Sequence, residues 1–141
     1  MKIILNKCFG GFDVSPQGYE LYAKKKGLGL YKYKDNLDFR NLKYIKLKEE
    51  ENKLFNHYFT KDFGEIAIIS GEDYKKYNLY LGEEYRQDQT LIEVVEELGE
   101  KASGRFGKLE VVEIPDNSFY KIDEYDGVET IYYSDTEINV K

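Results

Sequence analysis

The fold is decided by one stretch of the sequence, residues 86–114, which reads RQDQTLIEVVEELGEKASGRFGKLEVVEI. Its apolar residues recur at helical spacing from Leu91 to Ala102, and its glutamates fall largely off that stripe. Asp88 is placed to cap this helix, and Ser103-Gly104 is expected to end it, since glycine accepts the left-handed C-terminal conformation. An apolar strand over 108–114 follows. The stretch therefore predicts a helix that leads directly into a strand.

The N-terminal part of the chain predicts a second strand and a second helix. Residues 1–6 (MKIILN) are a short apolar strand. Ser15 is a good N-cap with Pro16 at the first helical position, and Lys26-Gly27 is a typical helix end. These elements supply surfaces on which the central helix and strand can pack.

The C-terminal part contains the strongest hairpin signal, Asp126-Gly127, because both positions of a tight two-residue turn need positive φ. Directly opposed glutamates on neighbouring strands, Glu124 and Glu129, are unfavourable. Arg86 or a cation of a partner would relieve them; alternatively, both carboxylates lie at the solvent rim of the sheet. The turn fixes a register with four cross-strand pairs: Tyr125 with Val128, Glu124 with Glu129, Asp123 with Thr130, and Ile122 with Ile131.

The middle of the chain is rich in tyrosine and alternates in the manner of strands. Residues 71–87 are polar and are expected to form a loop with at most one helical turn. Taken together, the elements predict a single α+β domain spanning residues 1–141, with a mostly antiparallel sheet and two helices packed on it. The middle strands are expected at 28–34, 44–48, 54–60 and 65–70, with a turn at Asp35-Asn36 and a hairpin at 61–64.

Composition excludes several classes of protein. One cysteine and one histidine in 141 residues exclude an internal disulfide and a Cys/His zinc site. No apolar run has the length of a membrane span or a signal peptide, so we expect a cytosolic protein. Residues 1–48 hold 11 Lys/Arg and 4 Asp/Glu, whereas residues 49–141 hold 10 and 23. This asymmetry indicates either an ordinary soluble surface or two faces of opposite charge.

Two features could bind an anion. Gly10-Gly11 lies between a strand and a helix start, where free backbone N–H groups can cradle an anion beside Lys7; the alternative is a tight connection in which the glycines only make the turn. Arg86, with Asp88, lies at the start of the central helix and could clamp a phosphate or carboxylate. The alternative there is an ordinary cap and a surface salt bridge.

Catalytic signals are weak. The only histidine, His57, lies among aromatic residues and is expected to be structural. Cys8 is expected to be a small buried residue at a strand end, although a nucleophilic role is an alternative. Glu124 and Glu129 could form a hydrolytic carboxylate pair. We therefore expect a protein that is not an enzyme and needs no cofactor or metal.

Four motifs resemble a group of small bacteriophage and prophage proteins of uncharacterised activity. They are KCFGGF at residues 7–12, VVEELG at 94–99, LEVVEIPD at 109–116 and EYDGVE at 124–129. An Arg and an Asp precede the central helix in that group, as Arg86 and Asp88 do here. Residues 35–81 have no counterpart in it, and its basic, Trp-containing tail is missing. The resemblance implies a phage gene and the cytoplasm of a bacterial host.

Two functions follow as hypotheses. In the first, a non-catalytic phage protein, acting as a homo-oligomer, counters a host antiviral defence by sequestering a small anionic, nucleotide-type signal at a hollow formed where both chain ends meet. In the second, the protein inhibits a host nuclease or CRISPR effector with an acidic surface that imitates nucleic acid, through Glu93, Glu96 and Glu100. The ligand-binding residues of the first hypothesis are Lys7, Cys8, Phe9, Gly10, Gly11, Phe12, Arg86, Asp88, Tyr125, Asp126 and Glu129.

Overall fold

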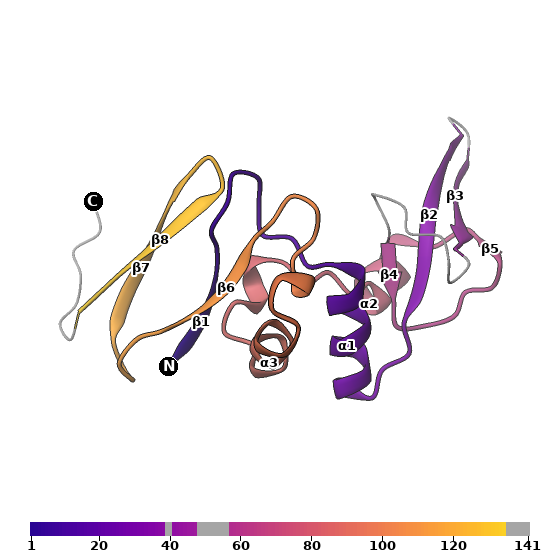
Figure 1. The fold of residues 1–141 in the computed structure, drawn as a ribbon. Coiled ribbons are helices and arrows are strands. Elements are labelled where there is room, and N and C mark those ends of the chain that lie inside the picture. The colour runs from indigo at the N-terminus through magenta and orange to yellow at the C-terminus, as the bar shows by residue number, and fades with distance from the viewer. Residues whose placement is uncertain (39–40, 48–56, 135–141) are drawn as a thin grey trace. The chain divides into compact units, whose positions relative to one another are not determined.

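The first strand, β1 (Lys2–Asn6), finds its partner near the other end of the chain, in the antiparallel strand β6 (Leu109–Glu113). Figure 1 shows the two strands side by side. Ile3, Ile4 and Leu5 are all fully buried, although side chains alternate between the two faces of a strand. Both faces of this ribbon are therefore covered, which explains why the sequence of β1 is apolar rather than alternating.

The computed structural model describes residues 1–38, 41–47 and 57–134, and the chain divides into two units. Unit 1 consists of Met1–Tyr22 and Leu81–Lys141, so it is assembled from both chain ends. Unit 2 is the intervening segment Ala23–Tyr80. All four motifs that carry the phage-protein resemblance lie in unit 1. That the whole chain forms one domain stays a prediction.

Helix α3 (Gln89–Leu98) begins as expected, because the Asp88 carboxylate accepts a hydrogen bond from the Leu91 backbone N–H at 2.9 Å. The expected end at Ser103-Gly104 is wrong. The α-helix stops at Leu98, where Gly99 has a φ of +59°, and a 3-10 helix η2 (Gly99–Ala102) continues the chain. Ala102 is nevertheless fully buried, so the apolar stripe extends past the end of the α-helix.

The C-terminal hairpin forms with the expected register: β7 (Phe119–Tyr125) and β8 (Val128–Ser134) are joined by Asp126 and Gly127 at φ values of +49° and +90°. Its inward face carries Tyr120, Ile122 and Ile131, which pack against the cluster of Ile3, Leu5 and Ile114. The hairpin thus covers one face of the β1–β6 ribbon, while α3 contacts both strands of that ribbon.

Helix α1 (Pro16–Lys26) starts at the expected cap, since the Ser15 hydroxyl accepts a hydrogen bond from the Gly18 N–H at 3.0 Å. Its buried Tyr22 donates its hydroxyl to the Asp88 carboxylate at 3.3 Å. One carboxylate therefore caps α3 and links it to α1, within unit 1.

Unit 2 contains a four-stranded antiparallel sheet in the order β4-β2-β3-β5. The expected turn at Asp35-Asn36 is wrong, because both residues lie inside β2, where pairing with β3 extends the strand. The hairpin expected at 61–64 is also wrong, because β4 pairs with β2 while β5 pairs with β3. The strands are β2 (Tyr31–Asp38), β3 (Asn41–Lys46), β4 (His57–Phe59) and β5 (Ile66–Ala67); positions 48 and 54–56 of the expected strands lie outside the described residues.

The 61–64 segment is held by hydrogen bonds from side chains and not by the backbone pairing of a hairpin. The buried Tyr33 hydroxyl donates to the Gly64 carbonyl at 2.8 Å and accepts from the Phe63 N–H at 2.9 Å. The Asp62 carboxylate accepts from Lys46 at 2.7 Å. Tyr33 belongs to the aromatic core of unit 2, with Tyr44 and Phe59. Tyr33 is thus a core residue whose hydroxyl forms hydrogen bonds with backbone groups of a loop.

The segment 71–87 contains more helix than expected. Helix α2 (Gly71–Tyr77) is capped by Ser70, whose hydroxyl accepts from the Asp73 N–H at 3.1 Å, and a 3-10 helix η1 (Glu83–Tyr85) follows in unit 1. The described part of the chain therefore has three α-helices, not two. The α+β class and the antiparallel pairing are confirmed, with the strands spread over three sheets. In the described ranges no helix is both long and apolar enough for a membrane span.

Candidate functional site

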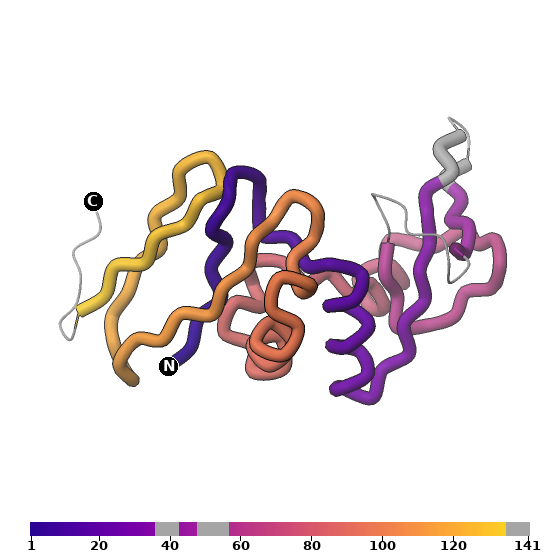
Figure 2. The backbone as a smooth tube through the Cα atoms, in the orientation of Figure 1, coloured from indigo at the N-terminus to yellow at the C-terminus, as the bar shows by residue number. Residues whose placement is uncertain are grey.

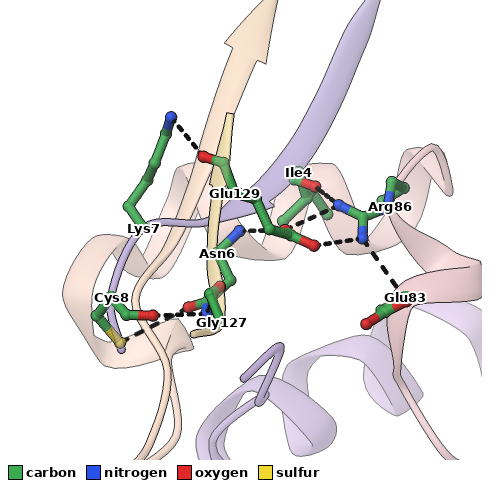
Figure 3. A network of polar contacts seen from close by, with 8 residues as sticks. All are labelled: Ile4, Asn6, Lys7, Cys8, Glu83, Arg86, Gly127 and Glu129. Carbon is green, nitrogen blue, oxygen red and sulfur yellow. Dashed lines mark hydrogen bonds and ion pairs between the residues drawn. The ribbon is translucent and has the colours of Figure 1, made fainter. Parts of the chain in front are cut away.

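Arg86 and Glu129 form a bidentate, largely buried ion pair in unit 1 (Figure 3). Nη1 of Arg86 donates to Oε1 of Glu129 at 3.0 Å, and Nη2 donates to Oε2 at 2.7 Å. The two side chains are 14% and 5% exposed. Parallel hydrogen bonds between a guanidinium and a carboxylate are the strongest form of this contact. The pair is therefore a fixed structural element rather than a surface salt bridge.

Residues on both sides hold Arg86 in position. Its backbone carbonyl accepts from the Ile4 N–H at 2.8 Å, and its Nη1 donates back to the Ile4 carbonyl at 3.0 Å. The guanidinium carbon lies 5.4 Å from the centre of the Phe12 ring, within the range of a cation–π contact. Arg86 thus ties the end of η1 to β1 and to the loop after it.

Asn6 connects this pair to the hairpin turn. Its backbone N–H donates to Glu129 Oε1 at 2.7 Å, and its side-chain amide donates to the carbonyls of Gly127 and Cys8 at 2.7 and 3.0 Å. Its Oδ1 accepts from the Lys108 N–H at 2.8 Å. The residue is fully buried. Three of these four bonds join Asn6 to segments far from it in the sequence, namely β8, the hairpin turn and the residue before β6, so Asn6 is the hub of the network in Figure 3.

Two glycines allow the loop after β1 to touch the hairpin turn (Figure 2). A Cβ atom on Gly127 would lie 2.4 Å from the Gly10 carbonyl oxygen, and one on Gly10 would lie 2.0 Å from the Phe106 carbonyl oxygen. Such approaches are closer than real Cβ atoms make. Three backbone segments therefore meet here at distances that only glycine permits.

The electrostatics of the pair favour its charged form. Burial alone would raise the pKa of Glu129, but hydrogen bonds from Arg86 and from the Asn6 N–H more than offset it, so the pKa lies below its usual 4.5. Burial alone would lower the pKa of Arg86, and the Glu129 carboxylate reverses this effect, so that pKa is raised. Both groups are charged at neutral pH.

The donors expected to hold an anion all donate within the protein. Arg86 donates to Glu129 and Ile4. The remaining donors are Gly10 N–H to the Asp126 carbonyl at 3.2 Å, Gly11 N–H to the Phe106 carbonyl at 3.1 Å, and Lys7 Nζ to the Glu129 carbonyl at 3.0 Å. An anion at this junction would have to compete with Glu129 for Arg86.

Unit 1 places most of the expected ligand-binding residues around this junction: Lys7, Cys8, Gly10, Gly11, Phe12, Arg86, Asp126 and Glu129 contribute contacts to it. Asp88 instead caps α3 and binds Tyr22. Phe9 and Tyr125 project outward, at 72% and 74% exposure. Of the two opposed glutamates, Glu129 is relieved by Arg86, and Glu124 is exposed. The alternative with both carboxylates at the solvent rim is therefore wrong for Glu129.

Sequence reasoning missed Asn6 and Phe106. Asn6 carries one usable signal, a polar residue that ends the apolar run MKIILN and faces a buried position. Phe106 contributes through its backbone carbonyl, which accepts from Gly11 and from the Cys8 thiol. A backbone acceptor leaves no trace in residue identity, so no pattern could have revealed it.

The candidate enzymatic residues have structural partners. The Cys8 sulfur lies 3.5 Å from the Phe106 carbonyl oxygen and 3.7 Å from Asn6 Oδ1. In unit 2, His57 Nε2 lies 2.9 Å from an Asp35 oxygen, and its Nδ1 lies 3.1 Å from the Tyr74 hydroxyl. The imidazole is surrounded by the rings of the aromatic core. This arrangement orients the ring as a core residue.

Unit 1 is thus an α+β unit locked by a buried ion pair, with its acidic helix face outward. Comparison of the chain with protein-family models, with curated proteins and with solved structures found no match. The resemblance to the phage and prophage proteins stays a prediction.

Proposed function

We propose that this protein is a phage-encoded, non-catalytic accessory protein that counters a host antiviral defence. In this proposal, the acidic surface of unit 1 occupies the nucleic-acid site of a host nuclease or CRISPR effector. One observation carries it: unit 1 holds 8 Lys/Arg and 18 Asp/Glu, a formal charge of −10, whereas unit 2 holds 13 and 9, a charge of +4. A field of one sign steers a basic partner and favours its capture.

Exposed carboxylates of α3, η2 and β6 supply this surface. Glu93, Glu96 and Glu100 are exposed, as are Glu110 and Glu113 on the strand that α3 contacts. Glu96 also binds Lys2 at 2.9 Å, which lowers its value to a partner. The apolar stripe of α3 faces the core, so a partner can contact Glu93 on the opposite side without any loss of packing.

Reversing two of these charges is expected to weaken inhibition. The test uses a purified CRISPR effector or nuclease with labelled DNA, and it measures how much protein displaces the DNA. Glu93→Lys with Glu100→Lys should weaken displacement by about tenfold or more, and 0.5 M salt should weaken the wild type similarly. Glu65→Lys with Glu72→Lys changes the net charge equally on unit 2 and should leave displacement unchanged. Equal loss in both variants would mean that only net charge matters, which contradicts a docking surface on unit 1.

The sequestration of a nucleotide-type signal is a second proposal, and the exposed rings of Phe9 and Tyr125 favour it because bases stack on such rings. It requires an anion to displace Glu129 from Arg86. Calorimetry with cyclic and linear nucleotides tests it, and the absence of heat with all of them would remove it. Self-association of the protein, tested by light scattering, is a separate prediction.

A further inference from the structure

A small hollow lies beside the tip of the β7–β8 hairpin and measures about 190 Å³. Sites for drug-sized ligands span about 300–1,000 Å³, so this hollow is too small for a nucleotide but large enough for one side chain. It is lined by two aromatic residues, one aliphatic residue, one threonine and two acidic residues: Phe9, Tyr125, Val128, Thr130, Asp123 and Glu124.

The fold holds the walls of the hollow rigidly. The hairpin register pairs Tyr125 with Val128 and Asp123 with Thr130, which places these four residues on one face of the hairpin. Phe9 comes from the loop after β1, and the bond from the Gly10 N–H to the Asp126 carbonyl holds that loop against the turn. The two aromatic rings are therefore exposed on backbone segments that are held together, which is typical of a contact site.

The charges around the hollow select a cation. Asp123 and Glu124 are exposed, and among the described residues neither has an ion-pair partner. Asp126 is also exposed at the adjoining turn. Aromatic faces attract a cation, and the carboxylates add charge-assisted hydrogen bonds, whereas a phosphate would be repelled.

We infer that this hollow receives an arginine side chain of a protein partner. The guanidinium stacks against the rings of Phe9 and Tyr125 and donates to the carboxylate of Asp123, and Val128 contacts its aliphatic stem. Arginine fits better than lysine because its planar head stacks on rings and forms paired hydrogen bonds with carboxylates. The inference rests on the proposed function insofar as the partner is a basic protein, and it names the contact that such a partner makes.

The test uses peptides, so it does not depend on any host effector. An acetylated Gly-Arg-Gly amide and its citrulline counterpart, which is neutral and nearly equal in shape, are titrated into the full-length protein. NMR follows the ring signals of Phe9 and Tyr125. We expect the arginine peptide to shift both rings and to bind about fivefold more tightly than the citrulline peptide.

Three variants locate the contact. Tyr125→Ala, and separately Asp123→Asn, should remove the preference for arginine. Phe119→Ala removes another exposed ring of β7, at its opposite end, and should leave the preference intact. Equal binding of both peptides, or arginine-induced shifts that spare Phe9 and Tyr125, would overturn the inference. If the peptide binds as expected while no effector is inhibited, the arginine site is supported and the proposed function is contradicted. If inhibition is unchanged in both hollow variants, the proposed function is supported and the role of the hollow in it is contradicted.

Discussion

Arg86→Ala is expected to destabilise the protein by about 3–5 kcal/mol, because it leaves the buried carboxylate of Glu129 without its counter-charge. Removing one partner of a buried pair costs more than the pair itself contributes, since the remaining charge cannot recover its hydration. Urea unfolding followed by circular dichroism measures the loss. Hydrogen exchange should localise it to β1 and β8, the strands that the pair connects.

Two controls separate the ion pair from general effects of arginine removal. Arg105→Ala removes an exposed arginine from the same unit and should change the free energy of unfolding by no more than about 0.5 kcal/mol. Arg86→Met combined with Glu129→Leu removes both charges and should recover much of the loss. If the double variant is no more stable than Arg86→Ala, the uncompensated charge is not the cause.

The same pair predicts a dependence on pH. Because the pKa of Glu129 is lower in the folded protein than its usual 4.5, the unfolded chain binds the proton more readily. The stabilisation is therefore complete above pH 4.5 and is lost as the pH falls through the lower, folded-state pKa. Unfolding measured from pH 7 to pH 3 should show a steeper loss in the wild type than in Glu129→Gln. Parallel curves would contradict this assignment.

Gly10→Ala is expected to cost about 3 kcal/mol or more. Gly10 has a φ of +138°, and its new methyl group would lie 2.0 Å from the Phe106 carbonyl oxygen, so backbone strain and steric overlap add together. The displaced backbone also weakens the bond from the Gly10 N–H to Asp126. The melting temperature reports the loss.

The neighbouring glycine is the matched control. A methyl group on Gly11 meets nothing within 4 Å, so Gly11→Ala should change the stability by no more than about 0.5 kcal/mol. Comparable losses at both positions would mean that flexibility of the loop, and not the close contact at Gly10, sets its stability.

Local chemistry accounts for what the sequence predicted well. The Ser15 and Asp88 caps and the Asp126-Gly127 turn each depend on residues within three or four positions, and all three form as expected. The turn then predicted the hairpin register, which places Glu124 opposite Glu129. This pairing in turn indicated that a cation such as Arg86 would relieve the repulsion between the two carboxylates. Partners from distant segments overrode the local signals elsewhere: Asp35 lies in a strand because β3 pairs there.

The candidate site was only partly predictable for a related reason. The residue types of Arg86, Gly10 and Gly11 indicate that these positions can donate hydrogen bonds to an anion. The groups that accept those hydrogen bonds in the folded protein have no such signal in the sequence. Whether Arg86 faces solvent or Glu129 depends on tertiary packing, and the acceptors of Gly10 and Gly11 are backbone carbonyls. The sequence thus predicted which residues lie at the junction but not which groups accept their hydrogen bonds.

The assembly of unit 1 from two remote segments has a consequence for biosynthesis. The Asn6 amide reaches the Gly127 carbonyl across 121 positions, and among the strands that the structure describes β1 pairs with β6 alone. In a nascent chain the apolar Ile3-Ile4-Leu5 segment therefore has no strand partner until translation has passed Leu109. The strands of unit 2 are closer together in the sequence and can pair much sooner. During that interval the segment is a natural client for holdase chaperones, and slow codons before residue 109 would prolong its exposure.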